Sequence, residues 1–470
     1  MNGRARIIRF SLVLFSLISL LSLSLWMLDG HDTRAQQSVQ VKRKSGQVLA
    51  AVVNAPAMLP VQALPAPAGG FSPQTRLGFT SGDQWEPAIA ADRYGHVYVL
   101  YAQYNGVPGC QECYSPSMIL QISSDRGATW TAPALIYPAG AETGQWDPQI
   151  AVDPMDGKTV FASWLQNGKS DTVVAKSTDF GITWSVVTAD STQAGTDKPI
   201  LAFRGPDVYV GFNHAQKVWV AASHDGGLTF TNSNVNPNGK LGWSLASGGT
   251  VDPNGHVYFA WAGYTRNGGA RGPVNLYVSN SSDGGATWSL TTIDVSGAPP
   301  DCSAYLCGWA YLGAQIAMTS DVAGNLYVLW NAGTVDKGPE RIYFAKSTNA
   351  GSTWSSKQDI SFAPTGTQHA FPAIVAGNAG DVRISWMDAR NHGLWNTYYR
   401  SSTDGGASWS AEVDLSTFVE GFTYIHPDGF NFPFGDYFEL DIDDRGRTQA
   451  VWGEGFNYDS PGSIWYTRGR

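Results

Sequence analysis

Residues 281–288 read SSDGGATW, and near copies of this octet recur along the chain. The six copies begin at Ser123, Ser177, Ser223, Ser281, Ser347 and Ser402. They share the pattern Ser-x-Asp-x-Gly-x-Thr-Trp with conservative departures, and successive copies lie 46 to 66 residues apart. Ser and Asp side chains bond nearby backbone N–H groups, glycine supplies a positive φ, and the Trp can cover a hairpin end. The octet therefore predicts a tight turn between two strands, repeated once per structural unit.

A second repeat precedes each octet and reads as a short strand, a turn and a longer strand. Its seven copies begin at Pro87, Pro148, Pro199, Gly249, Gln315, Pro372 and Glu439. A third strand, the octet and a short fourth strand follow the first six copies, but the chain ends before a seventh octet. We expect residues 75–80 to supply the missing strand. The sequence predicts an all-β, seven-bladed β-propeller of four-stranded antiparallel blades, closed by an N-terminal strand, with six blades as the alternative.

The composition agrees with a β-rich chain. Gly (53), Trp (18), Tyr (20) and Phe (20) are abundant, whereas charged residues make up only 15%. A net charge of −9 without a Lys/Arg run argues against nucleic acid or an anionic membrane as the main partner. No cofactor or metal is expected. The acidic stretch 441–447 looks like a cation loop, but its register predicts the first turn of the last blade.

The N-terminus predicts export. Three arginines precede an apolar run over residues 10–28, and a small-residue cleavage motif follows. We expect residues 1–35 to be a signal peptide or an uncleaved anchor, 36–70 an Ala/Pro-rich linker and 71–470 the propeller. This division predicts a secreted or cell-surface protein with a possible membrane tether, and we expect it to be a monomer.

The four cysteines form two close pairs, Cys110/Cys113 and Cys302/Cys307. In an exported protein such pairs predict two local disulfides that fix loops. A four-cysteine zinc site is the alternative, although only one pair has the Cys-x-x-Cys spacing.

The octets resemble the Asp-box, or bacterial neuraminidase repeat, of sialidases and many other propellers. The resemblance covers residues 75–470 and implies the sialidase-like propeller superfamily. Asp-boxes also occur in non-catalytic assembly factors and receptor ectodomains, so the resemblance implies a fold rather than an activity. The Phe/Tyr-Arg-Ile-Pro motif of the sialidase active site is missing from this sequence, and Arg76 in QTRLGF is no substitute.

Function is expected on the face opposite the octets. The octets and the first turns of the blades are short and share one face, whereas the loops of the other face are long and varied. These loops carry further candidate contacts, namely Arg266, Arg271, Arg341, Trp309, Tyr311, Tyr424 and His426.

Alignment of the inner strands predicts a ring of residues at the mouth of the central channel. Glu86, Asp147, Lys198 and Tyr437 share one register, and Trp85, Trp146, Asp197 and Asp436 lie one position earlier. Converging carboxylates can leave an acid beside a base, as glycoside hydrolysis requires. We expect catalytic roles for Glu86, Asp147, Asp436 and Tyr437, and ligand contacts from Lys198, Trp85 and Trp146. The alternative is that these side chains bond neighbouring backbone and close the channel.

The stretch WMDARNHGLW of the sixth blade offers a second ligand contact. Arg390, held in position by Asp388, would bind a carboxylate or sulfate while the Trp395 ring stacks on a sugar. Alternatively, Asp388 and Arg390 form an ion pair that shapes the loop.

Three functions remain open from the sequence. The first is a propeller that binds glycans, the second a glycoside hydrolase of exo-sialidase-like type, and the third a non-catalytic assembly or scaffold factor. A glycan or glycoconjugate is the expected ligand for the first two.

Overall fold

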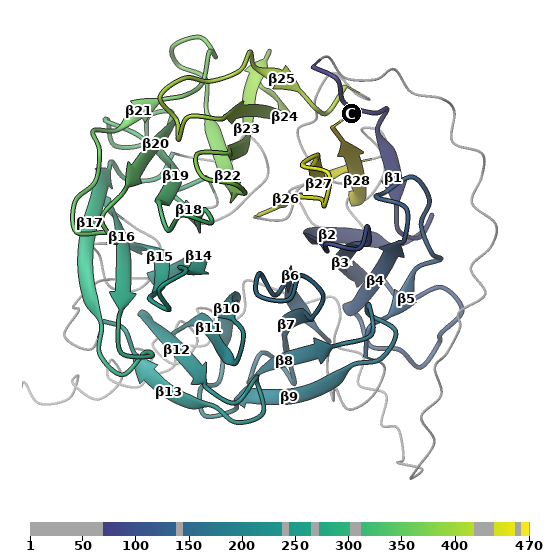
Figure 1. The fold of residues 1–470 in the computed structure, drawn as a ribbon. Helices are drawn as coiled ribbons and strands as arrows, with labels where there is room; N and C mark the ends of the chain where they lie inside the picture. The colour runs from purple at the N-terminus through teal and green to yellow at the C-terminus, as the bar shows by residue number, and fades with distance from the viewer. Residues whose placement is uncertain are drawn as a thin grey trace, which may run out of the picture. The chain divides into compact units, whose positions relative to one another are not determined.

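The computed structural model describes residues 69–137, 144–236, 244–264, 272–300, 312–417, 437–455 and 462–469. Within these ranges the regular elements are β-strands, which form seven four-stranded antiparallel sheets. The sheets stand as blades around a common centre (Figure 1). The predicted seven-bladed propeller is therefore confirmed. In the part of the chain described, no helix is long and apolar enough to cross a membrane.

The first four blades follow the chain from the inner to the outer strand. Blade 1 contains β2 (Asp83–Ala91), β3 (Val97–Tyr104), β4 (Ser117–Ser123) and β5 (Ala134–Leu135). Blade 2 contains β6 (Trp146–Val152), β7 (Val160–Gln166), β8 (Asp171–Ser177) and β9 (Ser185–Asp190). Blade 3 contains β10 (Thr196–Arg204), β11 (Asp207–His214), β12 (Lys217–Ser223) and β13 (Thr231–Asn234). Blade 4 contains β14 (Ser244–Val251), β15 (Val257–Tyr264), β16 (Val274–Ser281) and β17 (Ser289–Ser296).

The last three blades repeat this order, except that the chain start completes the final sheet. Blade 5 contains β18 (Ile316–Ser320), β19 (Leu326–Ala332), β20 (Arg341–Ser347) and β21 (Gln358–Asp359). Blade 6 contains β22 (His369–Ala376), β23 (Val382–Asn391), β24 (Leu394–Ser402) and β25 (Val413–Asp414). Blade 7 contains β26 (Glu439–Ile442), β27 (Thr448–Gly455), β28 (Gly462–Arg468) and β1 (Thr75–Leu77).

The N-terminal strand closes the ring as predicted. Thr75 pairs with Tyr466 and Leu77 with Ile464, so β1 is the outer strand of blade 7. The strand is shorter than the expected 75–80, since it ends at Leu77. The closure pairs the two ends of the described chain and gives the last blade its fourth strand.

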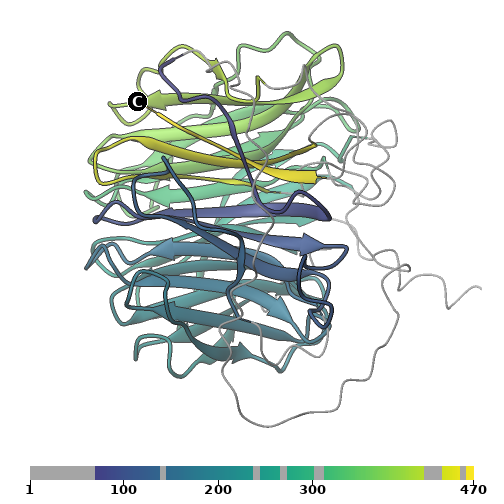
Figure 2. The same ribbon diagram turned by 90° about the vertical axis from the view of Figure 1, so that its right-hand side faces the viewer.

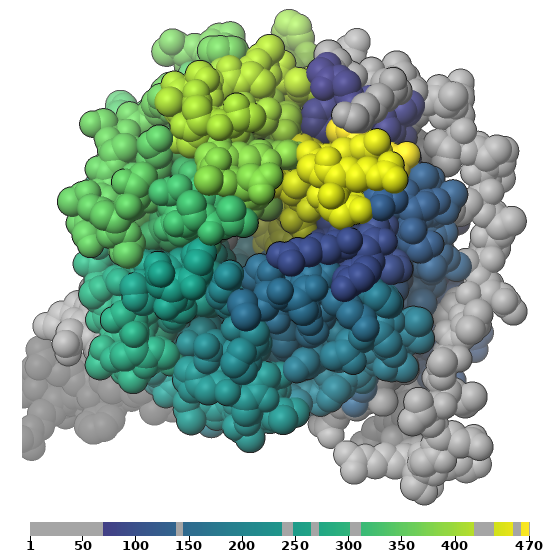
Figure 3. Space-filling view, viewed as in Figure 1, coloured from purple at the N-terminus to yellow at the C-terminus, as the bar shows by residue number. Residues whose placement is uncertain are grey.

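The core lies between the blades. The described residues form seven apolar clusters, and each cluster joins two neighbouring blades. The second strands of five blades each place a fully buried tryptophan there: Trp164, Trp261, Trp330, Trp386 and Trp452. The faces of neighbouring sheets therefore pack against each other, and the blades adjoin around the centre (Figure 3). Burial of large rings at each interface fixes the inner strands, and with them the channel-lining side chains.

The octets are hairpin structure, as predicted. Ser281 Oγ donates to Asp283 Oδ1 at 2.7 Å and accepts the Gly285 N–H at 2.8 Å. Thr287 donates to Asp283 through its hydroxyl at 2.6 Å, and this bond is the main reason that the pKa of Asp283 falls to about 2. The Ser hydroxyl bond and the Gly N–H bond recur in the other five copies. One copy has Asn349 in place of Asp, and there the Asn349 amide donates to the Thr353 hydroxyl.

The octets and the first turns of the blades share one face, as expected. Arg126 of the first octet pairs with Asp444 of the β26–β27 turn at 2.7 Å. In that turn Asp443 accepts the N–H groups of Arg445 and Arg447, both at 2.9 Å, which confirms that the stretch 441–447 is a blade turn. The strands run between this octet face and the opposite face, which Figure 2 shows edge-on.

Candidate functional site

A β-bulge places three of the predicted residues at one end of the channel. The inner strands of blades 1, 2, 3 and 6 break register at the same point, just before a proline. At this point Glu86, Asp147, Lys198 and Phe371 have φ values of 55°, 57°, 51° and 55°. Residues other than glycine rarely adopt this left-handed backbone conformation, and they keep it only where the surrounding structure holds them in it. Glu86, Asp147 and Lys198 thus occupy equivalent backbone positions in their blades, as the alignment of the sequence predicted.

A charged cluster surrounds this bulge. The Lys169 ammonium lies 3.1 Å from Asp197 Oδ1 and 3.6 Å from Asp147 Oδ2. Burial alone would lower the pKa of Lys169, but Asp147, Asp197 and Glu86 outweigh burial and raise it. Burial would raise the pKa of Asp197, yet Lys169 and Lys198 hold it below its usual value. Lys169 and Asp197 are therefore both ionised at neutral pH.

The sequence alone did not single out Lys169. It lies in the short loop between β7 and β8, outside the register that aligns the inner strands. Its only signal was its position on the face opposite the octets.

Tyr437 adds a side chain of the last blade to the charged cluster. Its hydroxyl donates to the Pro148 carbonyl at 3.1 Å, and the Lys198 ammonium lies 4.8 Å from the centre of its ring. Side chains of blades 7, 2 and 3 therefore meet at one end of the channel. Asp436, predicted beside Tyr437, lies outside the described residues.

The two predicted tryptophans lie at the edge of this cluster. Trp85 is half-buried and stacks on Tyr104, with ring centres 3.9 Å apart. Trp146 is also half-buried, and the Lys169 ammonium lies 6.0 Å from its ring. Both residues are partly exposed, as a stacking contact with a sugar would require.

The channel behind the cluster has a volume of about 260 Å³ and is lined by the inner strands of all seven blades. Lys198 and Tyr437 contribute to its wall. So do two carboxyl groups of β26 that were not predicted as site residues, Glu439 and Asp441. In the sequence they looked like ordinary positions of a strand.

Glu439 and Asp441 bind the free edge of the neighbouring inner strand. Glu439 accepts the Ile89 N–H at 3.0 Å and Asp441 accepts the Ala91 N–H at 2.7 Å. Burial raises the pKa of Glu439 to about 8 and that of Asp441 to about 7. At neutral pH the channel thus holds a protonated Glu439 and a partly protonated Asp441 behind a mouth where Asp197 is ionised. Within the described ranges no group of three or more His, Cys, Asp or Glu side chains is spaced to hold a metal ion.

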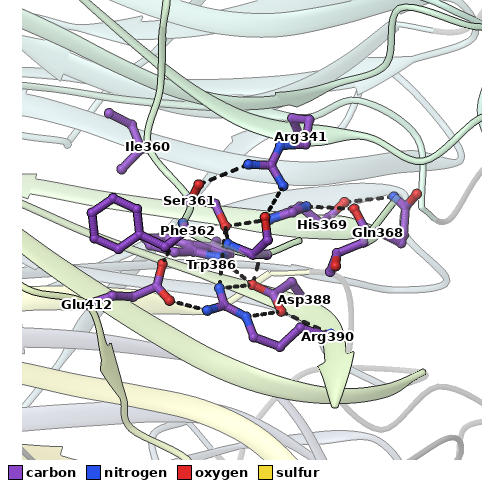
Figure 4. Close-up of polar contacts among 12 residues, drawn as sticks. Arg341, Ile360, Ser361, Phe362, Gln368, His369, Trp386, Asp388, Arg390 and Glu412 are labelled. Atoms are coloured by element: carbon purple, nitrogen blue, oxygen red, sulfur yellow. Dashed lines mark hydrogen bonds and ion pairs between the residues drawn. The ribbon is translucent and has the colours of Figure 1, made fainter. Parts of the chain in front are cut away.

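Arg390 lies in an ion-pair network rather than an open site (Figure 4). Its guanidinium contacts Asp388 at 2.5 Å and 2.8 Å and also pairs with Glu412. The ring centre of Tyr398 lies 3.7 Å from the guanidinium carbon, and Asp388 itself is fully buried. The geometry is that of the alternative interpretation, an ion pair that shapes the loop.

Trp395 differs from the expectation. It is fully buried in the apolar cluster between blades 6 and 7, near Phe371. A sugar could not stack on this ring without separating the blades. Arg341 is likewise engaged, because its guanidinium binds Asp359 at 3.0 Å and 3.2 Å. The other candidate loop residues lie outside the described ranges: Arg266, Arg271, Trp309, Tyr311, Tyr424 and His426.

One of the two predicted disulfides is present. Cys110 and Cys113 are bonded in the loop between β3 and β4, on the face opposite the octets. Cys302 and Cys307 lie outside the described residues.

Seven blades with Asp-box hairpins define a class of protein, the Asp-box propellers. Residues 74–303 match the family described as a BNR repeat-like domain. The chain has the fold of an Asp-box propeller, and residues 74–303 are similar to this family. A comparison with curated proteins found no match.

Several solved structures have a similar fold. A protein of unknown function from Dyadobacter fermentans is 16% identical, with a TM-score of 0.48 over 84% of this chain and 97% of that one. The Hadza microbial sialidase Hz136 is 14% identical, with a TM-score of 0.45 over 83% of this chain and 66% of that one. YCF48, solved with a D1 peptide, is 12% identical, with a TM-score of 0.46 over 86% and 98% of the two chains. At these identities the likeness concerns the fold alone.

Proposed function

We propose that this protein is exported and binds a glycan at the mouth of its central channel, on the face opposite the Asp-boxes. The observation that carries the proposal is the convergence of Glu86, Asp147, Lys198 and Tyr437 at one end of the channel. Glu86, Asp147 and Lys198 are each 5% exposed and sit at left-handed bulges. Strained, buried, charged positions of this kind cluster at ligand sites.

The neighbouring groups support a sugar ligand. Ionised carboxylates accept hydrogen bonds from sugar hydroxyls, and ammonium groups donate to sugar oxygens. Trp85 and Trp146 offer partly open rings beside them. Export is supported by the charged and then apolar N-terminus and by the Cys110–Cys113 disulfide, which suits an oxidising compartment.

A second candidate function, hydrolysis of the bound glycan, is favoured by Glu439. Glycosidases pair a protonated carboxyl group with an ionised one. Glu439, with a pKa near 8, lines the same channel as Lys198 and Tyr437. In this alternative Glu439 is the acid, and Glu86 or Asp147 is the base or nucleophile.

A glycan panel tests both functions. Binding and product release are measured on neutral and charged oligosaccharides with the wild type, Glu86→Gln, Asp147→Asn and Glu439→Gln. Asp207→Asn is the matched control, because Asp207 lies on the octet face in an exposed pair with His224. Binding lost in both mouth variants and kept in the control supports the proposal. Binding unchanged in both mouth variants would place the site elsewhere, and release that depends on Glu439 would establish the hydrolase.

A further inference from the structure

A carboxylate in the first turn of most blades bonds a side chain of the strand that follows the turn. In blades 1, 4 and 5 its Oδ2 accepts a tyrosine hydroxyl at 2.9, 3.2 and 2.8 Å, in the pairs Asp92–Tyr98, Asp252–Tyr258 and Asp321–Tyr327. Blade 7 uses an amide in the same role, because Gln449 donates to Asp443 Oδ2 at 2.9 Å. The second oxygen of the turn carboxylate thus has a side-chain partner in each of these four blades.

Blade 2 has the carboxylate without this partner. Asp153 is equivalent to Asp92, because its N–H donates to the Thr159 carbonyl as the N–H of Asp92 donates to that of His96. The ring two residues after Thr159 is Phe161, which has no hydroxyl group. The sequence of blade 2 therefore keeps the turn carboxylate and the aromatic ring but lacks the hydrogen bond that joins them in other blades.

The Asp153 carboxylate consequently uses only one of its oxygens. Oδ1 accepts the N–H groups of Met155 at 2.9 Å and Gly205 at 3.1 Å. Oδ2 forms no hydrogen bond or ion pair with any residue that the structure describes. Asp153 is only 5% exposed, and buried polar atoms nearly always have a partner. This oxygen therefore calls for a hydrogen-bond donor from outside the described chain.

A cavity opens beside Asp153, between the first turn of blade 2 and the octet of blade 3. Its volume is about 370 Å³, and its wall includes Asp153, Asp156, Phe161, Lys176 and Asp225. Both turns belong to the octet face, so this cavity is separate from the central channel. The missing hydroxyl and the cavity thus occur at the same place.

Two further carboxylates in the wall are ionised at neutral pH. Burial would raise the pKa of Asp156, but hydrogen bonds, above all from Thr159, outweigh burial and lower it. Hydrogen bonds from Thr229 hold the pKa of Asp225 well below its usual value. Neither of these carboxylates forms an ion pair within the described ranges. The wall therefore offers a cation a negatively charged environment around the free oxygen of Asp153.

The basic side chains around the cavity have other partners. Lys176, in the wall, donates to a backbone carbonyl of the next octet at 3.2 Å. Arg93 donates to the Pro154 carbonyl at 2.6 Å, and the Lys158 ammonium lies 4.9 Å from the centre of the Phe180 ring. A cation from another molecule can therefore reach the cavity without breaking an ion pair of this chain.

Exposed apolar side chains flank the cavity on two sides. Met155 lies beside Gly205, which belongs to the wall. Leu228 follows closely after Asp225 and Gly226 in the octet of blade 3. Apolar area around a charged pocket suits a protein partner better than a free small cation, because neighbouring side chains of the partner can cover it.

We propose that this cavity is a docking site for a lysine or arginine side chain of a partner protein. The ammonium or guanidinium group takes the place of the missing tyrosine hydroxyl and donates to Asp153 Oδ2. Apolar neighbours of that side chain in the partner pack on Met155 and Leu228. The octet face thereby carries a protein-binding site that is independent of the glycan site proposed at the channel mouth.

Methionine-methyl NMR on the full chain can follow docking through the signal of Met155, which Met155→Leu assigns. The probe is the peptide Ala-Leu-Arg-Leu-Ala, blocked at both ends, and its control carries norleucine in place of arginine. We expect the arginine peptide to shift the Met155 signal and to bind at least about tenfold tighter than the norleucine peptide, as one charge-assisted hydrogen bond allows.

Two variants connect this binding to the free oxygen. Phe161→Tyr restores the hydroxyl present in blades 1, 4 and 5, so it should weaken binding of the arginine peptide at least about tenfold while the fold is kept. Asp153→Asn should also weaken it, because the amide removes the charge but keeps an acceptor for the two N–H groups. Asp252→Asn in the equivalent turn of blade 4 is the matched control and should leave the affinity unchanged. If Asp153→Asn fails to fold, Phe161→Tyr still decides, because it adds a hydrogen bond rather than removing one.

Three results would overturn the proposal. The first is wild-type affinity of the arginine peptide for Phe161→Tyr, and the second is equal binding of the arginine and norleucine peptides or no shift of the Met155 signal with either. The third is binding of free ethylguanidinium as tight as that of the arginine peptide, since the apolar side chains would then contribute nothing and a protein partner would not be needed. None of these results bears on glycan binding at the channel mouth, which the glycan panel tests separately.

Discussion

The Lys169 ammonium lies 3.1 Å from the Asp197 carboxylate and joins two blades at the channel mouth. Lys169 comes from the loop between β7 and β8 of blade 2, and Asp197 from the start of β10 in blade 3. The Lys169 and Asp197 side chains are 34% and 28% exposed, so water screens the pair only in part. The ion pair therefore stabilises the channel mouth and keeps both side chains ionised.

Replacement of Lys169 by Met should destabilise the protein by about 1–2 kcal/mol, a buried-pair cost reduced for partial exposure. Asp147 and Asp197 would then face each other without the ammonium group. The double variant Lys169→Met/Asp197→Asn should recover part of the loss, which denaturant unfolding of the four proteins of the cycle measures. Additive effects in that cycle would contradict a direct interaction.

Tyr437→Phe should cost about 0.5–1.5 kcal/mol of unfolding free energy, the usual worth of one hydrogen bond. The substitution removes the donor to the Pro148 carbonyl but keeps the ring beneath Lys198. Chemical denaturation measures the stability, and calorimetry measures the affinity for the glycan. Tyr437→Leu, which removes the ring as well, should weaken binding further; equal affinities for the two variants would exclude the ring contact from the site.

Stability should fall as the pH rises from about 4.5 to about 8. The pKa of Glu439 is about 8 in the folded protein against 4.5 when unperturbed, and that of Asp441 is about 7 against 3.8. Between these limits the folded state retains protons that the unfolded state has lost, so unfolding releases protons and becomes easier as pH rises. Urea titrations across this range measure the slope.

Glu439→Gln is the control for this pH dependence. Its amide does not titrate, so the slope should become shallower. A remaining slope is expected, because burial also raises the pKa values of Asp441, Glu340 and Glu454. An identical slope in the variant and the wild type would show that Glu439 titrates normally.

Arg390→Met should destabilise the fold by about 3 kcal/mol, because it leaves the fully buried Asp388 without its cation. A coupling with Glu412→Gln in a double-mutant cycle would confirm the network. Glycan affinity of the folded variant should change little. A large loss of affinity for acidic glycans at unchanged stability would instead make Arg390 a ligand contact.

Ser281→Ala should lower the unfolding free energy by about 1–3 kcal/mol, since the buried Gly285 N–H loses its acceptor. Ser282→Ala in the same turn is the control, because Ser282 is exposed. Thermal unfolding and glycan titration are measured together. We expect lower stability and unchanged affinity, because this hairpin lies on the face opposite the channel mouth. A folded variant that has lost affinity would refute that placement.

Much of the fold was predictable because its signals are local. The Ser281–Asp283–Thr287 bonds lie within one turn, so the octet marks each hairpin wherever it occurs. The register of Glu86 and Asp147 was predictable for a similar reason, since the same bulge precedes Pro87 and Pro148.

The contacts among the side chains of the candidate sites were not predictable in this way. Trp395 and Arg390 lie in a stretch that reads like an exposed loop, yet Trp395 is buried at the interface with the next blade. Glu439 bonds Ile89, which is 350 residues away in sequence.

The sequence by itself determined the repeat and the face on which the octets lie, because these follow from turn chemistry and strand periodicity within some 60 residues. It favoured seven blades and a closing N-terminal strand, because the seventh copy of the inner-strand repeat lacks its octet. Only the tertiary structure decided which side chains meet at the channel. Lys169 is joined to Asp147 and Asp197, and Tyr437 reaches Pro148, because closure of the ring brings blades 7, 2 and 3 to one end of the channel. At that point burial and the neighbouring lysines together, rather than residue type, set which carboxyl groups are ionised and which keep their protons.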